Sequence, residues 1–227
     1  MKINKFFGVE GAKKARGITI VIDIFRAATV EAFLLSKEAK EIIPVGTVKE
    51  AFKYKKENPN YILCGEDRGY KIEGFDLDNS PFEISKIKSL EGKTIIHRSS
   101  SGTQGIVNAE NSQEIIFGSF VTASAITEYL VKHKPSICSI IAMDGPDTED
   151  EIFADFLISK LKNELPRNID EITEYLSRHH AAARFLDPNR PEFPKEDFYL
   201  SMDVDRFNFV PLVQDKKVIK YTNHLTA

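Results

Sequence analysis

The chain has 227 residues, which suits one large domain or two small ones, because globular domains usually hold about 100–200 residues. Hydrophobic residues make up 42% of the sequence and charged residues 29%, a globular composition that excludes wholesale disorder. Asp and Glu number 34 against 31 Lys and Arg, and no basic run forms the positive surface that nucleic acids need, so we expect no nucleic-acid partner.

Cysteine usage and hydropathy exclude further classes. Cys64 and Cys138 lie far apart without CxxC spacing, which argues against a disulfide framework and a structural zinc site. The longest apolar run, residues 18–24, already contains Asp23 and falls far short of the roughly 20 residues of a membrane span. Residues 1–14 lack the apolar segment of a signal peptide. We therefore expect a cytoplasmic protein without a membrane partner.

Short β-branched runs alternate with segments of helical periodicity, which is typical of βα units. The first run is apolar throughout, as strands covered on both faces tend to be. The predicted fold class is therefore α/β, a mostly parallel sheet with helices on both faces in three layers. The predicted strands are residues 17–23, 41–45, 61–64, 94–97, 114–117 and 137–143, and the predicted helices are residues 27–40, 47–58, 103–109, 122–133 and 148–163.

Two helix starts carry capping signals. Ser80-Pro81-Phe82-Glu83 places Ser at the N-cap, Pro at the first helical position and Glu three residues after the cap. Thr148 and Glu151 have the same spacing and predict a second capping box.

The pattern changes after residue 165. Prolines separate short helices there, and residues 207–213 and 217–222 form a candidate hairpin. We therefore place a soft boundary between an α/β core, residues 1–165, and a C-terminal segment, residues 166–227, packed on it, without assigning that segment an independent domain.

Polar residues gather at the predicted carboxyl ends of the strands, where open α/β sheets bind ligands. If the sheet is mostly parallel, these residues share one edge. They are Asp23 and Arg26, the loop from Glu66 to Asn79, the segment from Ser99 to Thr103, Ser119, and the segment from Asp144 to Glu151.

Three of these residues each have two interpretations. Asp23 is either the start signal of the helix at residue 27 or a metal ligand or catalytic carboxylate. Arg26 either holds a phosphate or sulfonate through two N–H groups or pairs with Asp23. Glu149 opens a helix, where the helix dipole alone favours acids, but it lies one turn before the apolar stripe, so we expect its carboxylate to point inward.

Two loops are also open to two interpretations. The segment from Ser99 to Thr103 is either a plain turn or an anion cradle of backbone N–H groups and hydroxyls at a helix N-terminus. The charged loop of residues 65–79 is either a solvated surface loop or a functional one, since long loops are uncommon inside compact domains. His97, on a predicted strand, fits a buried core histidine better than a functional one.

Several phosphatase and hydrolase classes do not fit. Cys64 and Arg68 are four residues apart, whereas a cysteine-dependent phosphatase needs its Arg six positions after the Cys. Asp23 is followed two residues later by Phe25, so the second acid of a haloacid-dehalogenase motif is absent. His179-His180 is not part of an HExxH zinc motif.

Five segments occur in the order seen in one family. They are IDIFRAAT (residues 22–29), GEDRGYKIEGFDLDNSPFE (65–83), SSSGTQGI (99–106), GSFVTASA (118–125) and EDEIFADFL (149–157). In these segments the chain resembles the 2-phosphosulfolactate phosphatase (ComB) family, and a weaker similarity at residues 197–211 extends the resemblance over nearly the whole chain. Two departures fall near the expected ligand loops, where Ser101 and Thr122 stand at positions that carry Asn in many members.

The resemblance implies a dedicated α/β fold and a magnesium-dependent phosphatase that hydrolyses 2-phosphosulfolactate to 3-sulfolactate and phosphate, a step of coenzyme M biosynthesis. The chemistry agrees, because this hydrolysis needs carboxylates to hold Mg²⁺ and cationic or amide groups around a small anionic substrate. The alternatives are a phosphatase for another small 2-phospho-acid and a non-catalytic protein that binds small anions. A homodimer is a further hypothesis.

The predicted site has three sets of residues, and we expect its members to converge on one cleft. Catalytic roles are assigned to Asp23, Glu66 and Glu149. Metal binding is assigned to the same three carboxylates, with Asp76 and Asp150 in reserve. Substrate binding is assigned to Arg26, Arg68, Lys71, Asn79, Ser80, Ser99, Ser100, Ser101, Gly102, Thr103 and Ser119.

Overall fold

The computed structural model describes residues 1–222, which form ten strands, ten α-helices and one short 3₁₀ helix, Phe120–Thr122. The strands are β1 (Lys2–Phe7), β2 (Gly17–Ile22), β3 (Glu41–Pro44), β4 (Ile62–Asp67), β5 (Tyr70–Lys71), β6 (Thr94–Arg98), β7 (Ser112–Gly118), β8 (Ile137–Ala142), β9 (Val210–Gln214) and β10 (Lys217–Tyr221). The helices are α1 (Gly8–Lys14), α2 (Ala27–Ser36), α3 (Val48–Glu57), α4 (Pro81–Ser85), α5 (Gly102–Asn108), α6 (Ala123–His133), α7 (Glu149–Leu161), α8 (Ile169–Ser177), α9 (His180–Leu186) and α10 (Lys195–Ser201).

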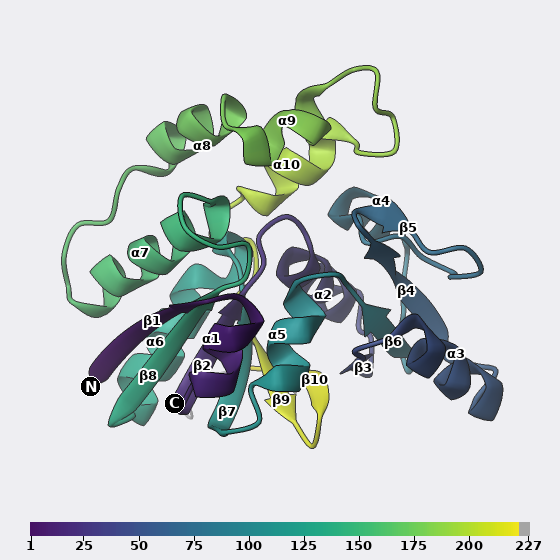
Figure 1. Cartoon of the computed structure of the whole chain (residues 1–227), viewed down its shortest axis with the longest axis horizontal. Helices are drawn as coiled ribbons and strands as arrows, with labels where there is room; N and C mark the ends of the chain where they lie inside the picture. The colour runs from purple at the N-terminus through teal and green to yellow at the C-terminus, as the bar shows by residue number, and fades with distance from the viewer. Residues whose placement is uncertain (223–227) are drawn as a thin grey trace.

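All strands belong to one mixed sheet in the order β1-β8-β2-β7-β9-β10-β3-β6-β4-β5. Strands β1, β8, β2 and β7 form one parallel block, and β3, β6 and β4 form a second. Helices cover both faces of this sheet (Figure 1). The α/β prediction is therefore confirmed.

The C-terminal hairpin joins the two parallel blocks. β9 pairs antiparallel with β7, β10 pairs antiparallel with β9, and β10 meets β3. The hairpin was predicted from the sequence, but its place in the middle of the sheet was not. The chain after residue 165 thus supplies two internal strands as well as the helices that pack on the sheet.

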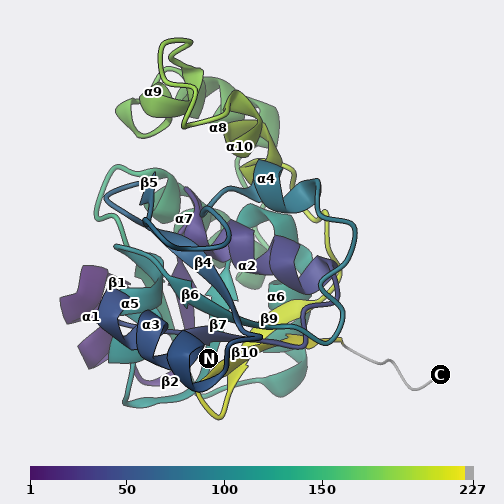
Figure 2. The same ribbon diagram turned by 90° about the vertical axis from the view of Figure 1, so that its right-hand side faces the viewer.

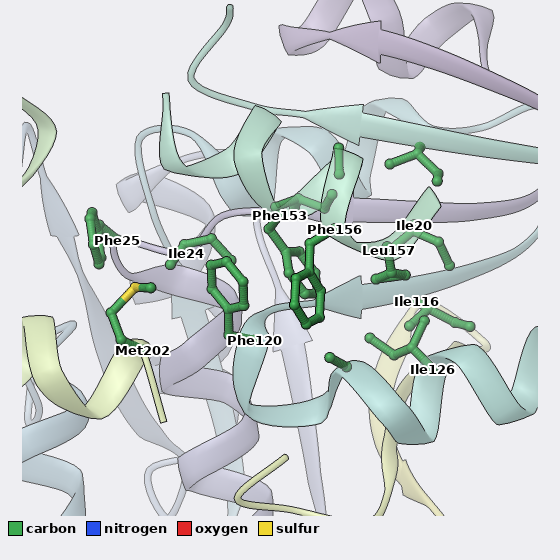
Figure 3. Packing of buried hydrophobic residues seen from close by; sticks show 14 of the residues in the cluster. Ile20, Ile24, Phe25, Ile116, Phe120, Ile126, Phe153, Phe156, Leu157 and Met202 are labelled. Atoms are coloured by element: carbon green, nitrogen blue, oxygen red, sulfur yellow. The ribbon is translucent and has the colours of Figure 1, made fainter. Parts of the chain in front are cut away.

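Strand β2 shows how the sequence builds two cores. All six of its residues are buried, and Ile18, Ile20 and Ile22 alternate with Val21 between two apolar clusters on opposite faces. On the first face, the ring centroids of Phe120 and Phe153 lie 4.7 Å apart, and Phe156 packs beside them at 5.5 Å from Phe120 (Figure 3). Burial on both faces is why β2 reads as a continuous apolar run.

Several local features differ from the sequence predictions. Residues 2–14 form β1 and α1, neither of which was predicted. β1 is an edge strand that pairs only with β8, and its lysines and asparagine interrupt the apolar pattern by which a strand is recognised in the sequence. Ser80 caps α4 as predicted, accepting from Glu83 N at 3.2 Å. The predicted capping box at residue 148 is wrong, because the Thr148 hydroxyl donates to the Gly145 carbonyl at 2.9 Å instead of accepting from the helix.

The short helices α8, α9 and α10 form a layer of their own across the top of the sheet (Figures 1 and 2). Aromatic side chains attach this helical layer to the loop after β2: the Phe25 ring lies 5.3 Å from Phe185 and 5.6 Å from Phe198. Within residues 1–222, no helix is long and apolar enough to span a membrane.

The strands of the two parallel blocks point in opposite directions along the sheet, because three antiparallel pairings separate β7 from β3. Yet the segments after β2 and β6 meet, since the backbone N–H of Gly102 donates to Asp23 at 2.7 Å. Sheet twist explains this, because about 20–25° per strand over the five steps from β2 to β6 amounts to roughly 100–125°. The carboxyl ends of both blocks therefore converge under the helical layer.

Candidate active site

A cavity of about 220 Å³ lies where these carboxyl ends converge. It is lined by Asp23, Phe25, Arg26, Glu66, Arg68, Gly69, Asn79, Ser100, Ser101, Asp144 and Arg184. A larger cavity of about 410 Å³ lies between α2 and the C-terminal hairpin, but its lining contains no carboxylate and no predicted site residue. The chemistry therefore points to the smaller cavity.

Asp23 and Asp144 line the cavity, and Glu149, which is not part of the lining, interacts with both of them. We call these three carboxylates the acid wall. Asp23 follows β2 and is 5% exposed; its carboxylate accepts from Ala27 N at 2.9 Å and Gly102 N at 2.7 Å. Burial, and then the charge of Asp144, raise the pKa of Asp23 to about 7. Asp23 thus bonds the first N–H of α2, as one interpretation predicted, and it also lines the cavity, as the other requires.

Glu149 lies just behind Asp23 and Asp144, at the first position of α7. It is 1% exposed, and its Oε2 atom has no hydrogen-bond partner among the described residues. Burial, then the charges of Asp144 and Asp23, raise the pKa of Glu149 to about 8. An inward carboxylate was predicted here, and its unpaired oxygen is the feature that a bound cation would satisfy.

Asp150, the next residue, has a different environment. Its carboxylate accepts from three backbone N–H groups, at 2.8 Å from Ile24, 3.1 Å from Met143 and 3.0 Å from Asp144. Burial and the neighbouring charge of Glu149 raise its pKa, while the Ile24 N–H acts in the opposite direction. Asp150 therefore joins the ends of β2 and β8, and it does not line the cavity.

The loop from Ser99 to Thr103 cradles carboxylates of the protein itself. Asp23 takes the N–H of Gly102, and Glu66 takes the N–H of Ser100 and also its hydroxyl at 3.1 Å. The N–H groups of Ser99 and Thr103 are bonded within the loop by the Thr103 and Ser99 hydroxyls, each at 2.9 Å. These four amides, predicted to bind a substrate anion, are all engaged by internal acceptors.

Three arginines also line the cavity around Gly69, namely Arg26, Arg68 and Arg184, and we call them the arginine wall. The Arg184 charge acts on Glu149, where it opposes the rise in pKa. Arg26 donates to the Gly69 carbonyl at 2.8 Å and to Asp197 Oδ2 at 2.8 Å, and it lies over the Phe185 and Phe193 rings. Its predicted pairing with Asp23 is not found. The Arg26–Asp197 pair is buried and joins the loop after β2 to α10.

Arg68 and Gly69 form the tight turn between β4 and β5, with φ angles of 53° and 90°. The Glu66 carboxylate accepts from Gly69 N, and Ser100 Oγ accepts from Arg68 N at 2.8 Å. The loop of residues 65–79, predicted to be functional or merely solvated, thus contains a hairpin whose turn lines the cavity.

A buried polar chain runs from the cavity into the core. Asn79 lines the cavity and bonds His97 Nε2 at 2.9 Å, and His97 Nδ1 bonds Glu31 at 2.8 Å. His97 and Glu31 are fully buried. His97 is therefore a hydrogen-bonded core histidine, as the sequence favoured, but one that holds a cavity residue in place.

Several predicted site residues lie outside the cavity. Lys71 donates to the Asp76 carbonyl at 3.1 Å, and the Asp76 carboxylate accepts from Leu63 N at 2.8 Å and Lys55 at 3.1 Å. The Ser80 hydroxyl donates to Asp197 at 2.7 Å, and Ser119 Oγ is buried without a partner in residues 1–222. None of these residues contributes to the cavity lining.

Four lining residues were not assigned to the site from the sequence: Phe25, Gly69 and two charged residues, Asp144 and Arg184. Asp144 had a detectable signal, because it directly follows the predicted strand at residues 137–143. Arg184 had none, because it lies on α9 in the proline-punctuated segment, and only the folding of the helical layer over the sheet brings it to the cavity.

The acid wall fits a magnesium ion by its donor chemistry. Within residues 1–222, no group of three or more Asp, Glu, His or Cys side chains is placed so that it could hold a metal ion. Magnesium does not need such a group, because it is usually held by one or two carboxylates together with waters and substrate phosphate. A bound cation would give the unpaired Glu149 oxygen a partner. It would also offset the repulsion between neighbouring carboxylates that helps to raise the pKa values of Asp23 and Glu149.

Comparison with known proteins supplies a family. A sequence model described as 2-phosphosulpholactate phosphatase matches residues 8–216. A "Probable 2-phosphosulfolactate phosphatase" from Carboxydothermus hydrogenoformans is 39% identical over 166 residues, covering 71% of this chain and 68% of the relative. Relatives with the same name from Thermotoga petrophila and Caldanaerobacter subterraneus are 34% and 31% identical, with 74% and 86% of this chain covered and 77% and 87% of the relatives.

Proposed function

The chain belongs to the 2-phosphosulfolactate phosphatase family, and from this premise we propose that it is a magnesium-dependent phosphatase that hydrolyses 2-phosphosulfolactate to 3-sulfolactate and phosphate. The observation that carries the proposal is one cavity lined by carboxylates and by three arginines. A substrate with three acid groups needs several cations, and this lining offers carboxylates that can hold a metal together with guanidinium groups that can bind acids directly.

In this proposal, one or two of the carboxylates Asp23, Asp144 and Glu149 hold Mg²⁺, together with waters and the substrate phosphate. Asp144 replaces Glu66 in the ligand set predicted from the sequence, because the Glu66 carboxylate accepts three hydrogen bonds, from Gly69 N and from the Ser100 N–H and hydroxyl. Each Asp23 oxygen accepts only one, and the Asp144 carboxylate accepts one, from the Ser101 hydroxyl. When bound, the ion would neutralise phosphoryl charge and lower the pKa of a water molecule.

The other groups bind and orient the substrate. Glu66 fixes the turn of Arg68 against Ser100, so that the arginine wall and the loop after β6 keep a constant spacing. Asn79 lines the cavity, and His97 holds it through its Oδ1 atom, so its amide nitrogen is the group left for the substrate. Positioning of this kind is the main contribution that a protein makes to phosphoryl transfer, alongside charge compensation.

The test is phosphate release from a panel of phospho-acids with and without Mg²⁺. The proposal expects turnover of 2-phosphosulfolactate that EDTA abolishes and Mg²⁺ restores. Faster turnover of a different 2-phospho-acid would make that acid the substrate in place of 2-phosphosulfolactate. Tight binding of a phospho-acid without any phosphate release would favour a small-anion-binding protein.

The same proposal includes a cytoplasmic homodimer that acts in coenzyme M biosynthesis. Size-exclusion chromatography with light scattering measures the assembly. A monomer at micromolar concentration would remove the dimer from the proposal without affecting the catalytic part.

A further inference from the structure

Two guanidinium groups of the arginine wall are unused. Arg26 is engaged by Asp197 and the Gly69 carbonyl. The Arg68 and Arg184 side chains, in contrast, make no hydrogen bond or ion pair with any residue in the range 1–222, although both line the cavity. Arginines that line a cavity without a hydrogen-bond or ion-pair partner are suited to bind an anion that enters it.

Gly69 is shaped to admit Arg184. A Cβ atom added to Gly69 would lie 3.0 Å from Arg184 Nη1 and 3.1 Å from the Phe193 ring. The φ angle of Gly69, +90°, is also unfavourable for residues with a side chain. Arg184 also stacks on Phe185 and Phe193, at 5.3 and 5.6 Å from the ring centroids. The guanidinium plane is thus supported by aromatic rings while its N–H groups remain free, an arrangement that favours a forked contact with an acid.

We infer that Arg184 is the specificity-determining residue that binds the sulfonate of the substrate, and that the helical layer α8–α10 exists in part to bring it there. This inference rests on the proposed function. In 2-phosphosulfolactate the phosphoryl oxygen and the carboxylate share one carbon, whereas the sulfonate sits on the next carbon. If the phosphoryl group is held by the metal at Asp23 and Asp144, the sulfonate on the neighbouring carbon can reach a different part of the lining, to which α9 contributes Arg184.

Arg68 has a different place. Its backbone N–H is bonded to Ser100, which is bonded in turn to Glu66. Arg68 therefore lies beside the loop after β6, close to the groups on the phosphorylated carbon. Arg184 is the cation that comes from a separate layer, so its loss should affect one acid group of the substrate and leave the others in contact.

The experiment compares two substrates in the full-length protein with Mg²⁺: 2-phosphosulfolactate, and 2-phospholactate, which lacks the sulfonate. For Arg184→Gln we expect kcat/KM for 2-phosphosulfolactate to fall about 10- to 150-fold, as for the loss of a charge-assisted contact, and kcat/KM for 2-phospholactate to change by less than about threefold. Arg184→Lys, which keeps the charge but loses the fork, should lie between.

Arg190→Gln is the matched control. Arg190 also stacks on Phe193, at 4.6 Å, but it donates to the Tyr70 hydroxyl at 2.9 Å and lies outside the cavity lining. Its substitution should leave the ratio of the two kcat/KM values unchanged. The inference would be overturned if Arg184→Gln lowered kcat/KM equally for both substrates, or if it changed neither value.

Direct binding separates failure of this inference from failure of the proposed function. If the wild-type protein releases phosphate from neither substrate, the proposed function fails, and calorimetric titration with 3-sulfolactate and with lactate still tests the subsite. Binding of 3-sulfolactate that Arg184→Gln abolishes and Arg190→Gln preserves would support the subsite. No binding by the wild type, or equal binding by all three proteins, would refute it.

Discussion

The backbone N–H of Gly102 donates to Asp23 Oδ2 at 2.7 Å, and this bond joins positions 79 residues apart in the sequence. Because Gly102 follows β6 and Asp23 follows β2, the bond links the two parallel blocks at the cavity. A Cβ added to Gly102 would lie 2.6 Å from the Asp23 carboxylate, so only glycine permits this approach. The acid wall therefore depends on a contact between two halves of the sheet.

Glu149→Gln should raise thermal stability in metal-free buffer at about pH 8 while removing magnesium-dependent turnover. The amide carries no charge into a site where burial and neighbouring carboxylates oppose ionisation. Each 1 kcal/mol gained would raise Tm by about 2–4 °C in a protein of this size. Differential scanning fluorimetry and phosphate release measure the two effects; a variant that is less stable and still fully active would contradict the metal role.

Asp150→Asn should have the opposite pattern. The carboxylate accepts from three backbone N–H groups, and an amide has one oxygen instead of two, so at least one N–H loses its acceptor. We expect a loss of about 1–3 kcal/mol in the free energy of unfolding. Chemical denaturation measures it. Magnesium affinity of the folded variant should stay within a few-fold of wild type, and a complete loss of magnesium binding at unchanged stability would make Asp150 a ligand.

Thermal stability without metal should fall as pH rises. The pKa values of Asp23 and Glu149 are raised to about 7 and about 8 from ordinary values of 3.8 and 4.5. Their contribution to stability is therefore fully present below about pH 4 and is lost as pH rises through 7 and 8. Magnesium should restore it, so the Tm increase caused by Mg²⁺ should be larger at about pH 8.5 than at about pH 5.5. The reverse order would exclude these carboxylates as the binding site.

Arg26→Lys should loosen the helical layer. The guanidinium bridges Asp197 and the Gly69 carbonyl, and a lysine ammonium on a different stem cannot reproduce both contacts. Removing one partner of a buried ion pair costs about 3–5 kcal/mol, and we expect this substitution to cost less because the charge is kept. Hydrogen exchange should increase in residues 166–201, with a smaller change in β2. An unchanged exchange pattern combined with a large rise in KM would assign Arg26 to the substrate instead.

Some of the site could be predicted from the sequence because the relevant signals are local. Strand periodicity put Asp23 at the end of an apolar strand, where it lines the cavity, and helix periodicity predicted the buried, inward carboxylate of Glu149 beside it. Local signals also misled. A Ser-rich turn before a helix predicts a cradle for a bound anion, and the same N–H groups serve equally well for Asp23 and Glu66, which are distant in sequence.

The sequence by itself determined the α/β class, most strands and helices, the C-terminal hairpin and the family, because apolar periodicity, capping residues and motif order are written along the chain. Tertiary structure alone decided which polar groups meet. The hairpin inserts between β7 and β3, and the accumulated twist brings the carboxyl ends of two opposed blocks together. Folding of the helical layer then adds Arg184 and buries Arg26 against Asp197. These outcomes depend on contacts between segments more than 40 residues apart, which no local pattern encodes.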